Sequence, residues 1–193
     1  MNIRRAEAKD LLNILRCNLH NLPENYPMRF WTYSTLTWPE ISFLAEDDDR
    51  KVVGYVLCSI EREEKFPYQW VGHINSLSVL RPYRRMGLAR QLMDMAKDAM
   101  IRGTTVIEYI QLHVRKSNRA ALSLYRDKLG YEHHRLETKY YGDGEDAYSM
   151  RLPVTHMKHP QTWVAVIYYH VTHNTRQLAR RTVSRLRRRK LVL

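Results

Sequence analysis

Apolar and polar positions alternate along the first 152 residues with two different periods, and these periods predict strands and helices. Seven short apolar or alternating runs bounded by polar turns predict strands: 2–6, 41–46, 52–60, 74–80, 107–114, 131–137 and 148–152. Four runs with apolar residues at helical spacing predict helices: 11–19, 29–36, 88–101 and 119–125. The order β-α-α-β-β-β-α-β-α-β-β indicates a mixed sheet with helices packed on it, a three-layer α/β fold.

Local signals bound several of these elements. Asp10 precedes the first helix and is a residue type that caps helix starts. Two prolines, Pro23 and Pro27, disfavour a continuous helix between the first two helical runs. The polar run 47–51 predicts a turn between two strands, and the charged run 61–69 predicts a loop before the next strand.

Charge divides the chain into two parts. The formal net charge is +12 over 193 residues, but residues 153–193 contain nine Lys or Arg and no Asp or Glu, so residues 1–152 carry only +3. We therefore expect a domain at 1–152 and a basic C-terminal extension at 153–193. Within the extension, 162–169 is apolar and strand-like, and 177–193 is predicted to form a basic helix.

Cysteine usage and the absence of long apolar runs predict the compartment. Cys17 and Cys58 lie in apolar segments, which favours buried free thiols in a reducing compartment. The first residues lack the apolar core of a secretory signal, and no segment has the ~20 apolar residues that span a bilayer. We expect a cytosolic or nuclear protein.

A short basic turn joins the predicted strand 74–80 to the predicted helix 88–101. Gly87 allows close backbone approach, Ala89 is small, and a helix N-terminus attracts anions. Arginines flank the turn and supply charge for a pyrophosphate: Arg81, Arg84, Arg85 and Arg90. These features predict a coenzyme A binding turn, with a solvated basic turn as the alternative.

The same arrangement of strand, turn and helix occurs a second time. The predicted strand 107–114 is followed by a polar break at 115–118 and by the helix 119–125, which ends near Gly130. Two neighbouring units of this kind can hold an elongated, phosphate-bearing cofactor between them.

Several runs resemble known acetyltransferases. The pattern Arg84-x-x-Gly87-x-Ala89 after a strand matches the acetyl-CoA motif of the GNAT acetyltransferases. More narrowly, four runs are similar to the catalytic subunit of NatA-type N-terminal acetyltransferases: 22–26, 54–57, 112–122 and 139–148. The resemblance covers 1–152 and implies a GNAT-like three-layer α/β/α sandwich with a mixed, splayed central sheet. It also implies acetyl transfer from acetyl-CoA to the α-amine of protein N-termini, with a large auxiliary subunit beside the first helices.

The resemblance implies which residues hold acetyl-CoA. The thioester carbonyl would face backbone N–H groups of the strand 74–80, and Asn118 would hold the pantetheine arm. Tyr125, two helical turns after Asn118, would share its face and protonate the leaving thiolate, with a core aromatic as the alternative. The cofactor-binding set is Leu77, Val79, Arg84, Arg85, Gly87, Leu88, Ala89, Asn118 and Tyr125. No metal is expected.

The reaction also needs a group that accepts a proton, because a protein α-amine with a pKa of about 7.7–8.0 is partly protonated at neutral pH. His73 and His113 lie on the two strands that would flank the splay, and imidazole suits a base, directly or through water. A histidine in a strand can equally be structural. By resemblance, Glu24 in the proline-bounded loop orients or deprotonates the amine, while an ordinary solvated glutamate is the alternative.

The resemblance also implies the substrate pocket. Leu22 and Tyr26, together with Glu24, would select the first residue of the substrate, and Tyr140 and Tyr141 would close over its backbone. Arg115 would hold the loop geometry or the pocket. From the residues alone, paired tyrosines before Gly-Asp-Gly could equally form a packed hairpin loop.

Two parts of the chain depart from the family pattern, the run 61–70 and the basic extension 153–193. Three interpretations of the extension stay open: contact with ribosomal RNA, a nuclear import signal at 187–190, or a solvated basic end. The expected location is cytoplasmic and ribosome-associated, with a nuclear pool as an alternative. Two rival functions also stay open: a GNAT enzyme acting on lysine side chains or small amines, and a weakly catalytic accessory protein that binds nucleic acid or the ribosome.

Overall fold

The structure is a computed structural model that describes residues 1–63, 69–103 and 105–154. Strand β1 (Asn2–Arg5) is followed by helices α1 (Leu11–Leu19) and α2 (Met28–Thr37) and by strands β2 (Phe43–Glu46), β3 (Val52–Glu63) and β4 (Gln69–Val79). Helix α3 (Leu88–Arg102), strand β5 (Ile107–Arg115), helix α4 (Arg119–Ser123) and strands β6 (Glu132–Glu137) and β7 (Ala147–Pro153) follow. The short turns η1 (Ala8–Asp10), η2 (Arg81–Tyr83) and η3 (Leu124–Lys128) connect some of these elements.

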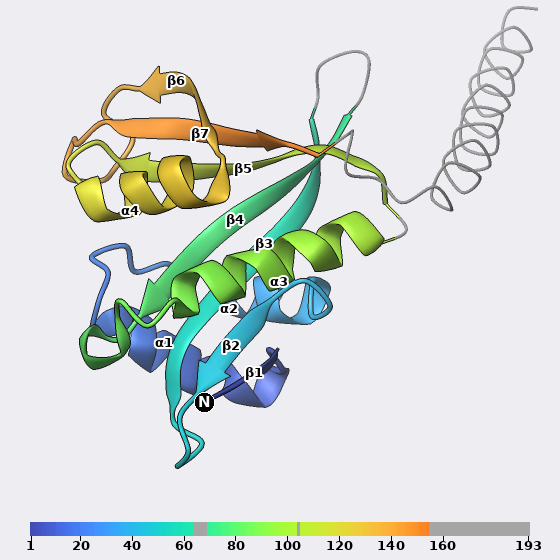
Figure 1. Ribbon diagram of the computed structural model, residues 1–193, viewed down its shortest axis with the longest axis vertical. Coiled ribbons are helices and arrows are strands. Elements are labelled where there is room, and N and C mark those ends of the chain that lie inside the picture. The colour runs from blue at the N-terminus through green and yellow to red at the C-terminus, as the bar shows by residue number, and fades with distance from the viewer. Residues whose placement is uncertain (64–68, 104, 155–193) are drawn as a thin grey trace, which may run out of the picture. The chain divides into compact units, whose positions relative to one another are not determined.

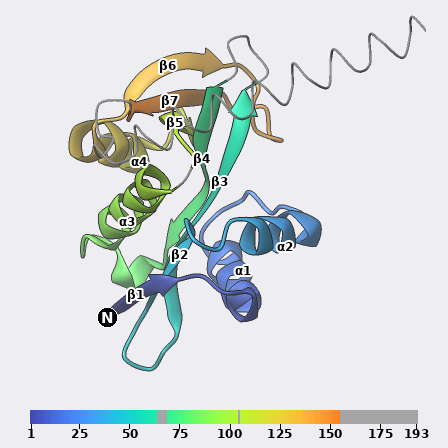
Figure 2. The ribbon, with the colours of Figure 1, turned by 90° about the vertical axis from the view of Figure 1, so that its right-hand side faces the viewer.

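One seven-stranded sheet forms the middle layer, with the strand order β1-β2-β3-β4-β5-β7-β6. Neighbouring strands are antiparallel except β4 and β5, which are parallel. Helices α1 and α2 cover one face, and α3 and α4 cover the other (Figures 1 and 2). The predicted order of elements, the mixed sheet and the three-layer α/β/α class are therefore confirmed.

Each face of the sheet has its own hydrophobic cluster. Leu92, Ala96 and Met100 of α3 pack on one face. Ile14 of α1 and Trp31 of α2 pack on the other. Because β3 is covered on both faces, its residues from 52 to 60 are all buried, which explains the nearly continuous apolar run in the sequence. Cys17 and Cys58 are buried free thiols, as predicted.

Two strands extend beyond their apolar runs. The pairs Arg62↔Trp70 and Glu63↔Gln69 continue the antiparallel ladder of β3 and β4, so the predicted loop at 61–69 is wrong at both of its ends. Backbone hydrogen bonds can extend a strand pair through residues with polar side chains. The side chain of Glu63 also has a polar partner. The Tyr109 hydroxyl donates to Oε2 of Glu63 at 3.1 Å.

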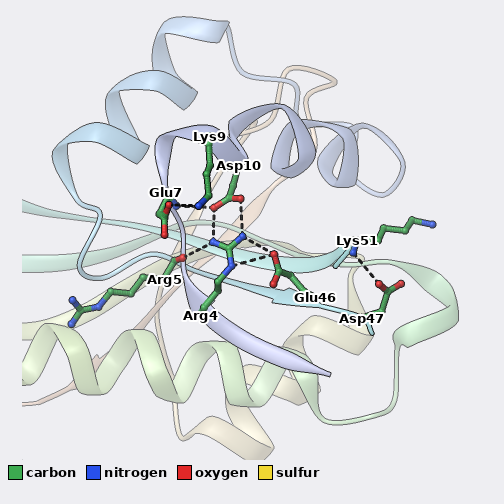
Figure 3. A network of polar contacts seen from close by, with 8 residues as sticks. All are labelled: Arg4, Arg5, Glu7, Lys9, Asp10, Glu46, Asp47 and Lys51. Carbon is green, nitrogen blue, oxygen red and sulfur yellow. Dashed lines mark hydrogen bonds and ion pairs between the residues drawn. The ribbon is translucent and has the colours of Figure 1, made fainter. Parts of the chain in front are cut away.

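An ion-pair network fixes the start of the chain (Figure 3). Arg4 donates to both carboxylate oxygens of Asp10, at 2.6 and 2.8 Å, and to Oε1 of Glu46, at 2.6 Å. Asp10 also accepts the backbone N–H of Glu7 at 2.9 Å. Asp10 stands at the N-cap position of α1, but its side chain makes no capping bond to that helix. The predicted cap is therefore wrong in its contact, because the charge-assisted pair with Arg4 takes both oxygens.

The predicted extension lies almost entirely outside the described residues. Pro153 ends β7 and Val154 is fully buried. The strand-like run 162–169 and the basic helix 177–193 lie beyond the part of the chain that the structure describes. Within the described part, no helix is long and apolar enough to cross a membrane.

Candidate active site

The sheet opens between β4 and β5. The two strands pair from Trp70↔Ile107 to Ile74↔Leu112. In the described segments 75–79 and 113–115, no ladder joins them, and the strands diverge in Figures 1 and 2. The predicted splay is present.

A bulge lies at the point where the strands separate. Leu57 of β3 pairs with Ser76, whereas its neighbour Cys58 pairs with Ile74, so Asn75 is an extra residue in β4. A bulge of this kind bends a strand and changes which face its side chains occupy. Leu77 and Val79 lie in the part of β4 that follows the bulge.

The basic turn between β4 and α3 lies at the far end of the separated segment. Arg85 and Gly87 have φ angles of +67° and +82°, and Gly87 is the N-cap residue of α3. No side chain among the described residues caps this helix at Gly87, so the N–H groups of its first turn are available to an anion. A Cβ at Gly87 would meet only Gln91 at 3.6 Å, so the positive φ, rather than lack of space, favours glycine.

The side chains around this turn divide into two kinds. Leu88 is buried and Ala89 is half-buried, so both pack α3 onto the sheet. Arg85 is exposed, as expected for a residue that would meet a pyrophosphate. Arg84 also braces the protein, because Nε donates to the carbonyl of Val79 at 2.9 Å and Nη2 donates to Oδ1 of Asn21 at 3.1 Å.

The second basic turn leads into α4. Asn118 is the N-cap residue of α4, and its Oδ1 accepts the backbone N–H of Ala121 at 3.1 Å. The α-helix ends at Ser123, and Leu124–Lys128 forms a π turn. The predicted α-helix through Tyr125 is therefore wrong in its last turn, and the spacing of two α-helical turns between Asn118 and Tyr125 does not hold.

The π turn places Tyr125 in the hydrophobic cluster on the α3 face. Its side chain contacts Tyr131 edge-on, with ring centroids 6.0 Å apart, and the backbone N–H of Tyr131 donates to the Tyr125 carbonyl. Burial raises the pKa of Tyr125 to about 12, so the hydroxyl keeps its proton at neutral pH. A π turn within a helix is frequent at functional sites.

Arg115 gathers three acidic side chains on the opposite face of the sheet. Nε donates to Oε1 of Glu24 at 2.7 Å, and Nη1 contacts Asp143 at 2.7 Å and Glu145 at 2.8 Å. The guanidinium carbon lies 4.1 Å from the ring centroid of Tyr141. The loop between α1 and α2 and the loop between β6 and β7 thus meet at one residue of β5.

His113 precedes Arg115 by two residues on the same face of β5. Its ring stacks on Tyr140, with centroids 4.4 Å apart and planes inclined by 16°. Nε2 lies 3.9 Å from Oε1 of Glu137. Burial lowers the pKa of His113, and Glu137 opposes that shift, so the imidazole is neutral at pH 7 and can accept a proton.

His73 lies on the neighbouring strand, within the paired part of the sheet. It pairs with Gln111, which is two residues before His113 on the same face of β5. Burial lowers the pKa of His73, with Glu61 opposing. Both predicted histidines are therefore neutral at pH 7, but only His113 lies where the strands have separated.

Three residues predicted to form the substrate pocket, Leu22, Glu24 and Tyr26, lie in the loop between α1 and α2. The backbone N–H of Leu22 donates to the carbonyl of Asn18 at 2.9 Å. The Tyr26 ring lies on Phe30, with centroids 4.2 Å apart, and the Tyr26 carbonyl accepts Nε1–H of Trp31 at 2.9 Å. The structure thus brings Glu24, Tyr26, Arg115, Tyr140 and Tyr141 to one face, with His113 beneath Tyr140.

Three buried polar residues behind this loop were not predicted from the sequence as part of the site: Asn18, Tyr55 and Ser76. Asn18 follows the buried Ile14 by four residues, so a polar residue on the apolar stripe of a helix was the available signal. Tyr55 stands in a run of buried strand residues and gives no comparable signal.

We searched the described part of the chain for side chains that could hold a metal ion together. Residues 1–63, 69–103 and 105–154 contain no group of three or more His, Cys, Asp or Glu side chains that could hold a metal ion. The candidate site therefore consists of a basic turn and a buried tyrosine on one face, and of the charged groups around Arg115 on the other.

Comparisons with known proteins agree on one family. Residues 8–131 match the acetyltransferase (GNAT) family. The N-terminal acetyltransferase A complex catalytic subunit ard1 of Schizosaccharomyces pombe is 48% identical over 160 residues, which are 82% of this chain and 88% of that protein. The N-terminal acetyltransferase A complex catalytic subunit NAA10 of Arabidopsis thaliana is 50% identical over 149 residues, which are 77% of this chain and 76% of that protein.

A solved structure shares the fold. A chain in the crystal structure of the NatC complex bound to Gag peptide and CoA superposes with a TM-score of 0.73 at 25% sequence identity. The match covers 80% of this chain and 98% of that chain.

Proposed function

The chain belongs to the acetyltransferase (GNAT) family, and on that premise we propose that it acetylates the α-amine of protein N-termini as the catalytic subunit of a NatA-type complex. Acetyl-CoA is the acetyl donor. The observation that carries the proposal is the meeting of Glu24 and Arg115 beside the opening between β4 and β5, with His113 on the same face. The anion-binding turn and Tyr125 belong to the other face, so donor and acceptor approach from opposite sides.

The residues present fit acetyl-CoA. Free N–H groups at the start of α3 and the exposed Arg85 suit a pyrophosphate. The separated segment of β4 has backbone groups that no longer pair with β5, and these suit the pantetheine and the thioester oxygen. Asn118, at the start of α4, is the residue for the pantetheine arm.

The reaction is a direct attack. The neutral amine nitrogen forms a bond to the thioester carbon, and the carbon–sulfur bond then breaks. His113 accepts the amine proton, directly or through a water molecule. Tyr125 gives its hydroxyl proton to the leaving thiolate and regains one from solvent.

Glu24 has an orienting role in this proposal. Its Oε1 is held by Arg115 at 2.7 Å, so the carboxylate has a fixed position from which to bind the amine. His113 is the better base, because it is neutral and lies at the opening. His73 lies within the paired ladder and has a supporting role.

The substrate peptide is expected between the two loops that meet at Arg115. Leu22 and Tyr26 line the pocket for the first side chain, and Tyr140 and Tyr141 cover the peptide backbone. Tyr140 is 49% exposed although it stacks on His113, which suits a side chain that contacts a ligand.

An auxiliary subunit has a suitable surface on the first helices. Large apolar side chains there are exposed: Leu12 at 70%, Leu19 at 58%, Met28 at 49%, Tyr33 at 59% and Leu36 at 61%. We propose this surface for the auxiliary subunit, and we propose that the enzyme acts in the cytoplasm in association with the ribosome. In this proposal, the basic extension contacts ribosomal RNA. A nuclear pool is the alternative, and localisation of chains that end at residue 154 would test it.

The experiment that tests the function offers acetyl-CoA and four peptides to the purified chain. The peptides begin with Ser, Glu or Met-Leu, and the fourth has a blocked N-terminus and a lysine. We expect acetylation of the Ser or Glu peptide at the α-amine, lost in Tyr125→Phe. Turnover of the blocked lysine peptide alone would move the assignment to a side-chain acetyltransferase. Failure to bind acetyl-CoA would contradict both assignments.

A further inference from the structure

A chain of buried polar side chains crosses the layer between the sheet and α1. The Tyr55 hydroxyl on β3 lies 2.7 Å from Oδ1 of Asn18 on α1 and 2.8 Å from Oγ of Ser76 on β4. Asn18 Nδ2 donates to the backbone carbonyl of Glu24 at 3.0 Å and to Oδ1 of Asn25 at 3.1 Å. Tyr55 and Asn18 are 0% exposed, and Ser76 is 8% exposed. Three different elements therefore contribute to one buried hydrogen-bond chain.

The hydrogen bonds among these buried side chains can run in only one direction. The Glu24 carbonyl can only accept, so Asn18 presents its amide nitrogen to it and its Oδ1 to Tyr55. The Tyr55 hydroxyl therefore donates to Asn18, and the Ser76 hydroxyl donates to Tyr55. Removal of the middle hydroxyl would leave both neighbours with a buried polar atom that has lost its partner.

The two ends of the chain lie at the two sides of the opening. Ser76 is the first paired residue of β4 after the bulge, in the segment that has separated from β5. Glu24 is bound to Arg115, which belongs to β5. The hydrogen-bond chain thus connects the strand that would hold the thioester to the loop that would hold the amine.

We propose, on the basis of the proposed function, that Tyr55 is a positioning residue that fixes the Glu24 loop relative to the separated segment of β4. Its ring is anchored by an edge contact with Trp31, with centroids 6.2 Å apart, so the hydroxyl has little freedom. Tyr55 touches neither substrate in this proposal. It acts through Glu24, whose distance from the thioester decides whether the bound amine is within reach of the carbonyl carbon.

The test is a double-mutant cycle between Tyr55→Phe and Glu24→Gln in the full chain. Tyr55→Phe alone is expected to lower kcat/KM for the peptide by about ten- to a hundredfold, because small displacements of positioning groups have effects of that size. The affinity for CoA should change less than about twofold, since the turn before α3 is untouched. In the Glu24→Gln background, Tyr55→Phe should have almost no further effect. Equal losses in both backgrounds would overturn the proposal.

A matched control separates positioning from simple loss of stability. Thr35→Val removes another buried hydroxyl, which donates to the carbonyl of Trp31 at 2.8 Å on α2. We expect Thr35→Val to lower the melting temperature while leaving kcat/KM unchanged. If both variants lose the same activity, the effect of Tyr55 is general and the proposal is wrong. If Tyr55→Phe does not fold, Ser76→Ala replaces it, because this variant removes the hydroxyl at the β4 end of the hydrogen-bond chain.

Hydrogen exchange measures whether the Glu24 loop is held in place, independently of catalytic activity. In Tyr55→Phe, the backbone N–H groups of Leu22 and Phe30, which donate to the carbonyls of Asn18 and Pro27 on either side of the Glu24 loop, should exchange at least ~10 times faster, while those of α3 stay unchanged. A wild-type chain that does not bind acetyl-CoA would contradict the proposed function, and this measurement would still decide whether Tyr55 fixes the loop. Unchanged exchange at both residues would overturn the inference even if the enzyme is active.

Discussion

Nε of Arg115 lies 2.7 Å from Oε1 of Glu24, and the two residues are 91 positions apart in the sequence. This ion pair joins the loop between α1 and α2 to β5, and the same guanidinium binds Asp143 and Glu145 from the loop after β6. Two loops on this face of the sheet therefore depend on one cation.

Arg115→Lys is expected to lower kcat/KM for the peptide at least ~10-fold, because an ammonium is a point charge and cannot reproduce a guanidinium fork that binds three carboxylates. KM for acetyl-CoA should stay unchanged, since that site is on the other face. Steady-state kinetics with each substrate varied in turn would show this. Arg126→Lys, at an exposed pair with Asp127, is the control and should have wild-type kinetics. Unchanged peptide kinetics in Arg115→Lys would remove Arg115 from the substrate site.

Tyr125→Phe should lower kcat by about 10²-fold, the usual contribution of a general acid, with little change in the affinity for CoA. The pKa of Tyr125 is raised to about 12 by burial, so the hydroxyl stays protonated and no basic limb from this residue should appear below pH 10. Stopped assays over a pH series would measure both effects. Tyr131→Phe, at the neighbouring buried ring, provides the comparison and should stay active. A fully active Tyr125→Phe would leave Tyr125 as a core residue only.

The acid limb of the pH–rate profile should belong to His113. Burial lowers the pKa of His113 below its ordinary 6.5, so the neutral base is present at pH 7 and is lost as the pH falls through the lowered pKa. The charge of Glu137 opposes this shift, and His73, Arg135 and Arg151 add to it. His113→Asn should lose at least ~10-fold in kcat/KM at pH 7, and its residual activity should lack this limb. His133→Asn should behave as wild type, and an acid limb retained in His113→Asn but lost in His73→Asn would reassign the base.

Asp10→Asn is expected to lower the free energy of unfolding by about 2–3 kcal/mol at pH 7, because it breaks a buried, bidentate pair with Arg4. The hydrogen bonds from Arg4 hold the pKa of Asp10 below its ordinary 3.8, so the unfolded state takes up a proton first as the pH falls. The contribution is therefore complete above about pH 5 and is lost as the pH falls through the lowered pKa.

Urea unfolding of wild type and Asp10→Asn at pH 7 and at pH 3 would measure that loss. The difference between the two proteins should shrink at the lower pH. Arg102→Gln, at an exposed pair with Asp98, should change the stability by less than about 0.5 kcal/mol at either pH. A difference that stays constant with pH would show that the pair contributes through packing rather than through charge.

The periodic pattern was enough to predict every strand and helix of the described domain in order. Central strands covered on both faces give nearly continuous apolar runs, and each helix has an apolar stripe that faces the sheet. The run 107–114 is an example, since it became β5 with one additional residue, Arg115. Element ends were less predictable where polar residues continue a ladder, as at Glu63 and Gln69.

The residue types of the candidate site carry signals in the sequence, whereas most of their contacts do not. The turn at Gly87 and the substrate loop carried recognisable patterns in sequence. The bulge at Asn75, the π turn that contains Tyr125 and the hydrogen bonds of Tyr55 depend on register and on long-range packing, which no local period encodes. The brace that Arg84 makes to Asn21 was missed for the same reason, because 63 positions separate the two residues.

The strand order also has a consequence for the order in which the chain can fold. Strands β2 to β4 each pair with the strand that precedes them in the sequence, so these pairings can form in succession while later residues are still absent. Strand β5 needs the crossover through α3, and its other edge is taken by β7, the last strand of the described chain. Until residues up to 153 arrive, the strand that carries His113 and Arg115 has an open edge, which is where a nascent or truncated chain would aggregate.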